Sequence, residues 1–181
     1  MWKCLGLRAS GSVSFFLGRF IDARAYLENI LCLWDPVYRA RPSWPVDPYM
    51  VGLLFLSITL RCLGYNDQAN QRCDEGVAEA RRLSPYNPAF TLAAAWNDDW
   101  AGRGPEAPQT MLRSADELLV ISSEHGFDGH PEVGSMIQGW CLGTVGCAAK
   151  SIPLLLQGVT SRRARGAALL LPLYLTMLAE I

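Results

Sequence analysis

The amino-acid sequence predicts an all-α protein, a solenoid of about four antiparallel helical hairpins followed by a trailing helix. Two observations carry this prediction: a short turn motif recurs along the chain, and small residues stand at fixed distances on both sides of it. In addition, no segment shows the sustained alternation of apolar and polar residues that indicates a strand. We therefore expect one helical-repeat domain over residues 1–181.

The recurring turn consists of a glycine, four further residues and a small residue that opens the next helix. It occurs near residues 18–23, 64–69, 102–107 and 146–151, a spacing of roughly 40 residues that is typical of helical repeats. A glycine at this place ends a helix in the left-handed conformation, and the polar residues after it start the next one. The motif therefore predicts four helix-to-helix turns.

Small residues extend the pattern into the helices on either side of each turn. Twelve residues before the small residue of the turn, and seven residues after it, the chain again has a small side chain, with Ile30 as the exception. Small side chains at fixed points on two successive helices let their backbones approach closely. The positions before the turns are Gly11, Ser57, Ala95 and Gly139; those in the turns are Ala23, Ala69, Ala107 and Ser151; those after them are Gly76, Ser114 and Gly158.

The predicted helices follow from these turns and from the proline-rich loops between hairpins. Pro108 and Pro153 are expected in first turns, where a missing N–H is tolerated, and Pro172 is expected to kink the last helix. First helices are predicted at 8–17, 47–63, 87–101, 131–145 and 168–180, and second helices at 20–34, 66–83, 105–125 and 148–163.

Composition excludes several classes of function. The chain has 16 Lys and Arg against 17 Asp and Glu, so its net charge of −1 favours neither nucleic acid nor an anionic membrane. The apolar runs 50–60 and 167–179 are shorter than the roughly 20 residues of a bilayer span. The six cysteines form no CxxC pair, which argues against metal and redox motifs and predicts free thiols in a cytoplasmic protein.

Three clusters of polar residues are candidate sites of chemistry. Arg162, Arg163 and Arg165 would form either a phosphate site or, as we expect, a solvated helix end. His125 and His130 lack the spacing of metal ligands on one helical face, so loop capping is the expected role. Adjacent Asp98 and Asp99 point apart on a helix and have no evident catalytic partner. We therefore expect no catalytic residue, no cofactor and no metal.

The turn sequences resemble those of tetratricopeptide repeats (TPR). The resemblance rests on segments 63–69 and 17–23, in which an aromatic residue follows the glycine by one or two positions. Further segments, including 26–36, 94–96, 122–127 and 139–142, narrow the likeness to one class. That class is the C-terminal region of large bacterial signalling proteins that join predicted ATPases to adenylate/guanylate cyclase-type domains.

The resemblance implies a TPR-like α-solenoid that acts as a non-catalytic protein-interaction or regulatory scaffold. In this family catalysis lies upstream, and the chain has no GxxxxGK[ST] phosphate-binding motif, so no catalytic residue can be carried over. The implied partner is a protein, a peptide or the upstream domains of a parent protein. Two alternatives stay open: the C-terminal piece of a nucleotide cyclase/ATPase whose catalytic domains lie upstream, and a degenerate repeat remnant without a partner.

First helices line the binding groove in TPR arrays, which directs attention to three tryptophans. Trp96, Trp100 and Trp140 fall on predicted first helices, where core packing is the expected role and peptide anchoring the alternative. Asn97 and Trp100 are the predicted groove-lining residues. The apolar last helix lacks a polar cap, which suggests a fragment of a longer array or self-association through apolar terminal helices.

Overall fold

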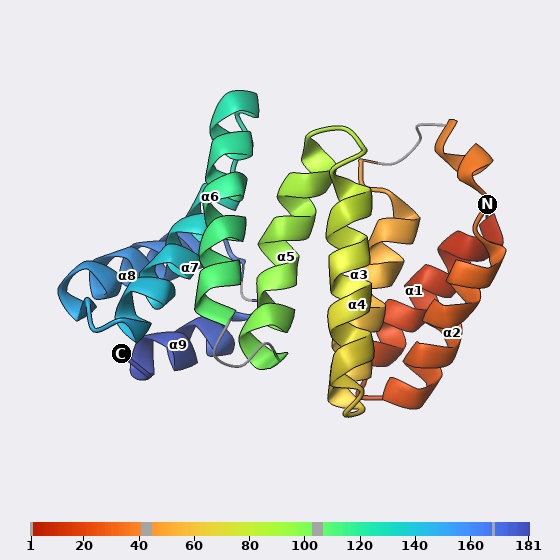
Figure 1. Cartoon of the computed structure of the whole chain (residues 1–181), viewed down its shortest axis with the longest axis horizontal. Helices are drawn as coiled ribbons and strands as arrows, with labels where there is room; N and C mark the ends of the chain where they lie inside the picture. The colour runs from red at the N-terminus through yellow and green to blue at the C-terminus, as the bar shows by residue number, and fades with distance from the viewer. Residues whose placement is uncertain (1, 41–44, 103–106, 168) are drawn as a thin grey trace. The chain divides into compact units, whose positions relative to one another are not determined.

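The computed structural model describes residues 2–40, 45–102, 107–167 and 169–181, with backbone only at 39–40 and 97–102. Within these ranges the chain forms nine α-helices and one short 3₁₀ helix, with no strand (Figure 1). The predicted all-α class is therefore confirmed. The chain divides into two compact units, Met1–Gly102 and Arg103–Ile181.

The first unit contains two helical hairpins and one further helix. Helix α3 packs against its own partner α4 and against both helices of the preceding hairpin, α1 and α2. Helix α5 packs in the same way on α3 and α4. Each hairpin is thus stacked on the one before it. The elements are α1 (Trp2–Phe16), α2 (Phe20–Leu33), η1 (Pro36–Ala40), α3 (Pro48–Cys62), α4 (Asn66–Ala80) and α5 (Tyr86–Gly102).

The second unit contains four helices, in which α7 has the central place. Helix α7 packs against α6 on one side and α8 on the other, and the short helix α9 folds back onto α8 and α7. The side chain of Trp140 on α7 donates a hydrogen bond to Glu180, which holds the end of α9 (3.2 Å). The elements are α6 (Ala107–His125), α7 (His130–Thr144), α8 (Ala148–Ala164) and α9 (Leu171–Ala179).

Three of the four predicted turns are confirmed in detail. Gly18, Gly64 and Gly146 all have positive φ, between 73° and 86°. In each turn the glycine N–H bonds to the carbonyl three residues back, and the next N–H bonds to the carbonyl five residues back. This is the Schellman pattern, which satisfies carbonyls left free at a helix end. Residues 103–106 of the fourth predicted turn lie outside the described part of the chain.

The small residues of the repeat pattern mark the places where helices touch. All twelve positions of the pattern are buried except Ser114, which is half-buried. Ala23, Ala69 and Ile30 belong to one apolar cluster with Leu56 and Leu60, which joins the first two hairpins. The pattern of small residues in the sequence therefore marks positions that are buried between packed helices.

Several predicted boundaries and two prolines need correction. Helix α1 begins at Trp2, several residues before the predicted start, and α9 spans Leu171–Ala179 in place of 168–180. Pro108 does lie in the first turn of α6. Pro153, however, lies inside α8, at an exposed position where water can reach the carbonyl that loses its partner. Pro172 opens α9 and does not kink it.

A matched pair of glycine substitutions tests this packing. A Cβ at Gly139 in α7 would lie 3.1 Å from the Ser151 carbonyl oxygen and 3.0 Å from the Leu154 Cβ, whereas a Cβ at Gly6 in α1 meets nothing within 4 Å. We expect Gly139→Ala to lower the free energy of unfolding by about 1–2 kcal/mol. Gly6→Ala should raise it by about 0.5–1 kcal/mol through helix propensity. Urea unfolding followed by circular dichroism measures both, and equal effects would contradict the close approach of α7 and α8.

Candidate functional site

Helices α1, α3 and α5, which correspond to the predicted first helices of the first unit, form an apolar pocket of about 270 Å³ together with the segment before α3. This volume lies just below the roughly 300–1,000 Å³ of typical small-molecule sites, so the pocket suits one or two side chains of a larger partner. Within the described residues, its lining holds a single charged side chain. The lining residues are Leu5, Arg8, Pro45, Val46, Pro48, Val51, Phe55 and Phe90.

Helical spacing places these side chains on one face. Leu5 and Arg8 are three residues apart on α1, and Val51 and Phe55 are four apart on α3, so each pair lies on the same side of its helix. Helix α3 packs on both α1 and α5, and this brings residues distant in sequence to one surface. The pocket is therefore a direct product of stacking the first helices.

Arg8 is the cation of the pocket. Its side chain is half-buried, and no hydrogen bond or ion pair joins it to any residue that the structure describes. No aspartate or glutamate is among the described lining residues. The described surface of the pocket is therefore apolar, with one positive charge that no described residue compensates.

An aromatic surface continues from the pocket along α1. The ring of Phe55 in the pocket meets the ring of Phe15 at 5.9 Å and that of Phe16 at 5.8 Å, both edge to face. Phe16 is 60% exposed, so this cluster is accessible to solvent. We call the pocket and these two phenylalanines the first-helix groove.

The wall of the groove before α3 is held by a buried asparagine. The side-chain oxygen of Asn87 accepts a hydrogen bond from the Asp47 N–H at 2.8 Å, and its Nδ2 donates to Ser84 Oγ at 3.0 Å. Asp47 in turn accepts from the Met50 N–H and caps α3. Asn87 thus ties the start of α3 to the start of α5, and with it the neighbouring groove residues Val46 and Pro48.

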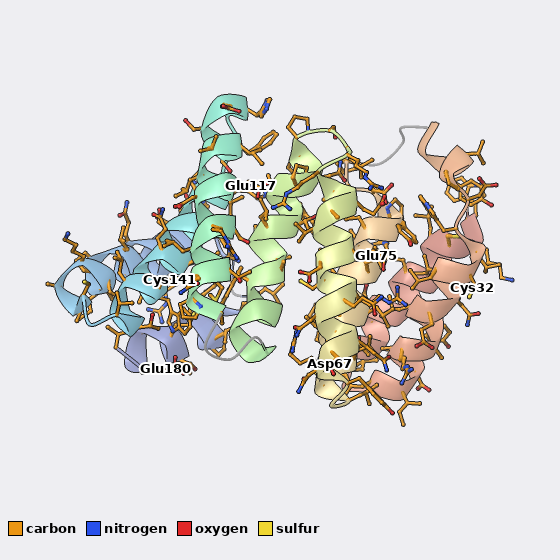
Figure 2. The ribbon with its side chains drawn as sticks, viewed as in Figure 1. Cys32, Asp67, Glu75, Glu117, Cys141 and Glu180 are labelled. Atoms are coloured by element: carbon orange, nitrogen blue, oxygen red, sulfur yellow. The ribbon has the colours of Figure 1, made fainter. Side chains whose placement is uncertain are left out.

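A second polar contact anchors α3 on the side of α4. The Tyr49 hydroxyl donates to Glu75 Oε1 at 3.1 Å, and Arg72 donates to the other oxygen of the same carboxylate at 2.7 Å (Figure 2 labels Glu75). Burial, followed by the nearby Glu75 charge, raises the pKa of Tyr49 to about 12. Helix α3 is therefore fixed by polar contacts to both α4 and α5.

The predicted groove residues lie on α5, but their side chains are outside the described part of the structure. The structure describes the backbone of Asn97 and Trp100 as part of α5, but it describes neither side chain. The same holds for Asp98 and Asp99. Among the described side chains of α5, Phe90 lines the groove, two turns before Asn97. Sequence reasoning missed it, although an aromatic one turn after the helix start on a first helix was a usable signal.

The two other tryptophans on first helices fill the core, as expected. Trp96 has 0% of its surface exposed and Trp140 has 8%. An anchor for a partner needs an accessible ring, so neither side chain is available for peptide binding. Core packing is thus confirmed for these two residues.

The histidines form a stacked loop cluster. The ring of His125 stacks on Phe127 at 5.6 Å, and Phe127 lies 6.2 Å from His130. Among the described residues, no three or more His, Cys, Asp or Glu side chains gather as a metal site would require. The residues therefore close the turn between α6 and α7.

The three arginines lie at the end of α8, where the helix dipole favours cations. Two of them also make tertiary contacts. Arg165 pairs with Glu132 at 2.6 Å, and the Arg162 guanidinium lies 5.2 Å from the centre of the Tyr174 ring. These contacts tie α8 to α7 and α9, which is a structural role.

All six cysteines are free thiols. Cys4, Cys73 and Cys141 are buried, whereas Cys32, Cys62 and Cys147 are exposed (Figure 2 labels Cys141 and Cys32). Burial raises the pKa of Cys141 to about 11, which keeps this thiol protonated at neutral pH. Cys141 therefore packs as a small apolar side chain and has little nucleophilic reactivity.

Removal of the Asn87 amide should loosen the groove wall. We expect Asn87→Ala to lower the free energy of unfolding by about 1–3 kcal/mol, because the Asp47 N–H loses its acceptor. The control is Asn29→Ala, at an exposed position on α2, where a change within about 0.5 kcal/mol is expected. Chemical denaturation of both variants measures the difference. A neutral effect at Asn87 would mean that the hydrogen bonds do not hold the two helix starts together.

His130 should make stability depend on pH. Burial lowers the pKa of His130 below its ordinary 6.5. Between the folded pKa and the unfolded value of 6.5, the unfolded chain binds a proton at this histidine that the folded chain does not. The contribution of neutral His130 to the free energy of unfolding is therefore fully present above pH 6.5 and is lost as the pH falls through the folded pKa. Urea midpoints at about pH 7.5 and 5 should fall less in His130→Gln than in the parent. His125→Gln serves as the control, and an unchanged pH dependence in His130→Gln would refute the effect.

The described helices include none that is both long and apolar enough to cross a lipid bilayer. Comparison with protein-family models finds no match to this sequence, and a search of curated proteins finds none either. The first-helix groove and the repeat pattern are therefore the features of the chain that bear on its function.

Proposed function

We propose that this chain is a non-catalytic protein-interaction or regulatory scaffold of the TPR type, and that its first-helix groove binds a segment of a partner protein. The observation that carries the proposal is the groove itself. Three stacked first helices present an accessible apolar surface with aromatic side chains and one arginine. Such a surface has the composition of a protein-binding site, in which aromatic residues and arginine are enriched.

The repeat pattern supports the same proposal. Schellman turns recur at three equivalent glycines, and α3 and α5 each pack on both helices of the hairpin before them. Helical arrays of this kind present extended surfaces for partners. The buried small residues also favour an intact array over a degenerate remnant, since decayed repeats would lose this register.

The chemistry of the groove favours binding over catalysis. Its described lining offers no nucleophile and no acid–base pair, and Arg8 alone cannot perform proton transfer at neutral pH. The scaffold role holds equally if the chain is the regulatory end of a bacterial signalling protein of the ATPase/cyclase type. In that case the groove would take a segment of the upstream domains.

A peptide selection tests the proposal. A phage-displayed library of random linear peptides is selected on the immobilised protein, and the enriched peptides are synthesised for binding measurements. Leu5→Glu places a carboxylate in the pocket three residues from Arg8, where it should pair with the guanidinium and repel an apolar segment. We expect this variant to weaken binding about tenfold or more, as loss of an anchoring contact does.

The matched control carries the same substitution on the other unit. Leu112 of α6 is exposed, and Leu112→Glu should leave peptide binding unchanged. Circular dichroism verifies that both variants remain helical. The proposal fails if no peptide is enriched, or if the enriched peptides bind Leu5→Glu as tightly as they bind the parent chain.

A further inference from the structure

The charge of the first-helix groove indicates the chemistry of its partner. Arg8 is the one charged side chain in the described lining, and it lies among Leu5, Val51 and Phe55 without a described acidic neighbour. A half-buried guanidinium beside apolar side chains is less well solvated than one in water, so an incoming anion interacts with it more strongly. Since no described carboxylate pairs with it, Arg8 can receive an anion from a partner.

The number of cations distinguishes between kinds of anion. Recognition of phosphorylated segments uses clusters of arginines, and binding of nucleic acid uses many cations along a surface. The described lining of this groove has Arg8 alone. A single guanidinium is matched by a single carboxylate, with which its planar fork forms two parallel hydrogen bonds.

The surface around Arg8 indicates what accompanies the carboxylate. The pocket of about 270 Å³ accepts a bulky apolar side chain, and the rings of Phe55, Phe15 and Phe16 extend the apolar surface beyond it. A segment that fills the pocket can therefore continue along α1. This favours an internal aspartate or glutamate of a longer segment as the source of the carboxylate.

We propose that the first-helix groove recognises a partner segment in which a bulky apolar residue enters the pocket and a neighbouring aspartate or glutamate pairs with Arg8. This inference rests on the proposed function and adds the chemistry of the partner. It assigns the apolar contact to affinity and the ion pair to specificity, because an uncharged segment would leave the guanidinium without its counter-charge.

The test compares three forms of one selected peptide, all with capped ends so that no terminal carboxylate contributes. The acidic residue is kept, replaced by its amide, or replaced by lysine, and binding is followed by fluorescence anisotropy. The parent chain should bind the acidic form about tenfold more tightly than the amide form, the range of a charge-assisted hydrogen bond that is partly exposed. Arg8→Gln should abolish this preference.

Reversing the charge of Arg8 should create binding to the lysine form of the peptide, and a variant that merely fails to fold could not show this gain. Arg8→Glu should prefer the lysine form of the peptide over the acidic form. The matched control is Lys3→Gln, which removes an exposed cation of the same helix outside the pocket and should keep the preference for the acidic form.

The contrary outcomes separate this inference from the proposed function. If the acidic and amide forms bind equally, or if Arg8→Gln keeps the preference, while Leu5→Glu still blocks binding, then the groove binds segments and the role of Arg8 is wrong. If no peptide binds in a manner that depends on Leu5, both proposals fail. If light scattering shows a dimer that Arg8→Glu dissociates, a second copy of the chain occupies the groove and the peptide proposal is overturned.

Discussion

The close approach of neighbouring helices at small residues is the constraint on which the structure depends. At Gly139 a single added carbon would meet the backbone of α8, and at Gly11 it would lie 2.7 Å from the Leu27 side chain of α2. Backbones this close leave room for only hydrogen or a small side chain. Because equivalent positions recur before and after each turn, one packing solution is repeated along the chain. Larger residues at these points would separate the hairpins and expose their apolar faces.

The groove follows from the same constraint. Once α3 is held against both α1 and α5, one face of each first helix contributes to a shared surface, and residues as distant as Leu5 and Phe90 line one pocket. The buried Asn87 then fixes the wall before α3, where apolar packing alone would leave the loop poorly positioned. Affinity and selectivity have separate sources here, since the apolar lining provides burial and Arg8 provides charge.

The local elements were largely predictable, because turn glycines, small residues and proline positions act over a few residues. The exceptions have physical reasons. Pro153 was expected in a first turn, but α8 begins at Ala148, and an exposed helix surface tolerates the lost hydrogen bond. Pro172 lies in the first turn of α9, where its missing N–H has no partner to lose, and Leu170 before that turn has a left-handed conformation. The pocket is harder to predict than the local elements, because its described lining comes from three helices and the segment before α3. The prediction of Asn97 and Trp100 as groove residues concerns side chains outside the described part of the structure.

The sequence by itself determined the helical class, the hairpin turns at Gly18, Gly64 and Gly146, and the residues through which the helices touch. These properties arise from backbone conformation and side-chain size, which are encoded locally. Only the tertiary structure decided that Arg8 shares a pocket with Phe55 and Phe90, and that no described neighbour compensates its charge. Such a site depends on which faces of distant helices meet, and spacing along one chain does not specify those contacts.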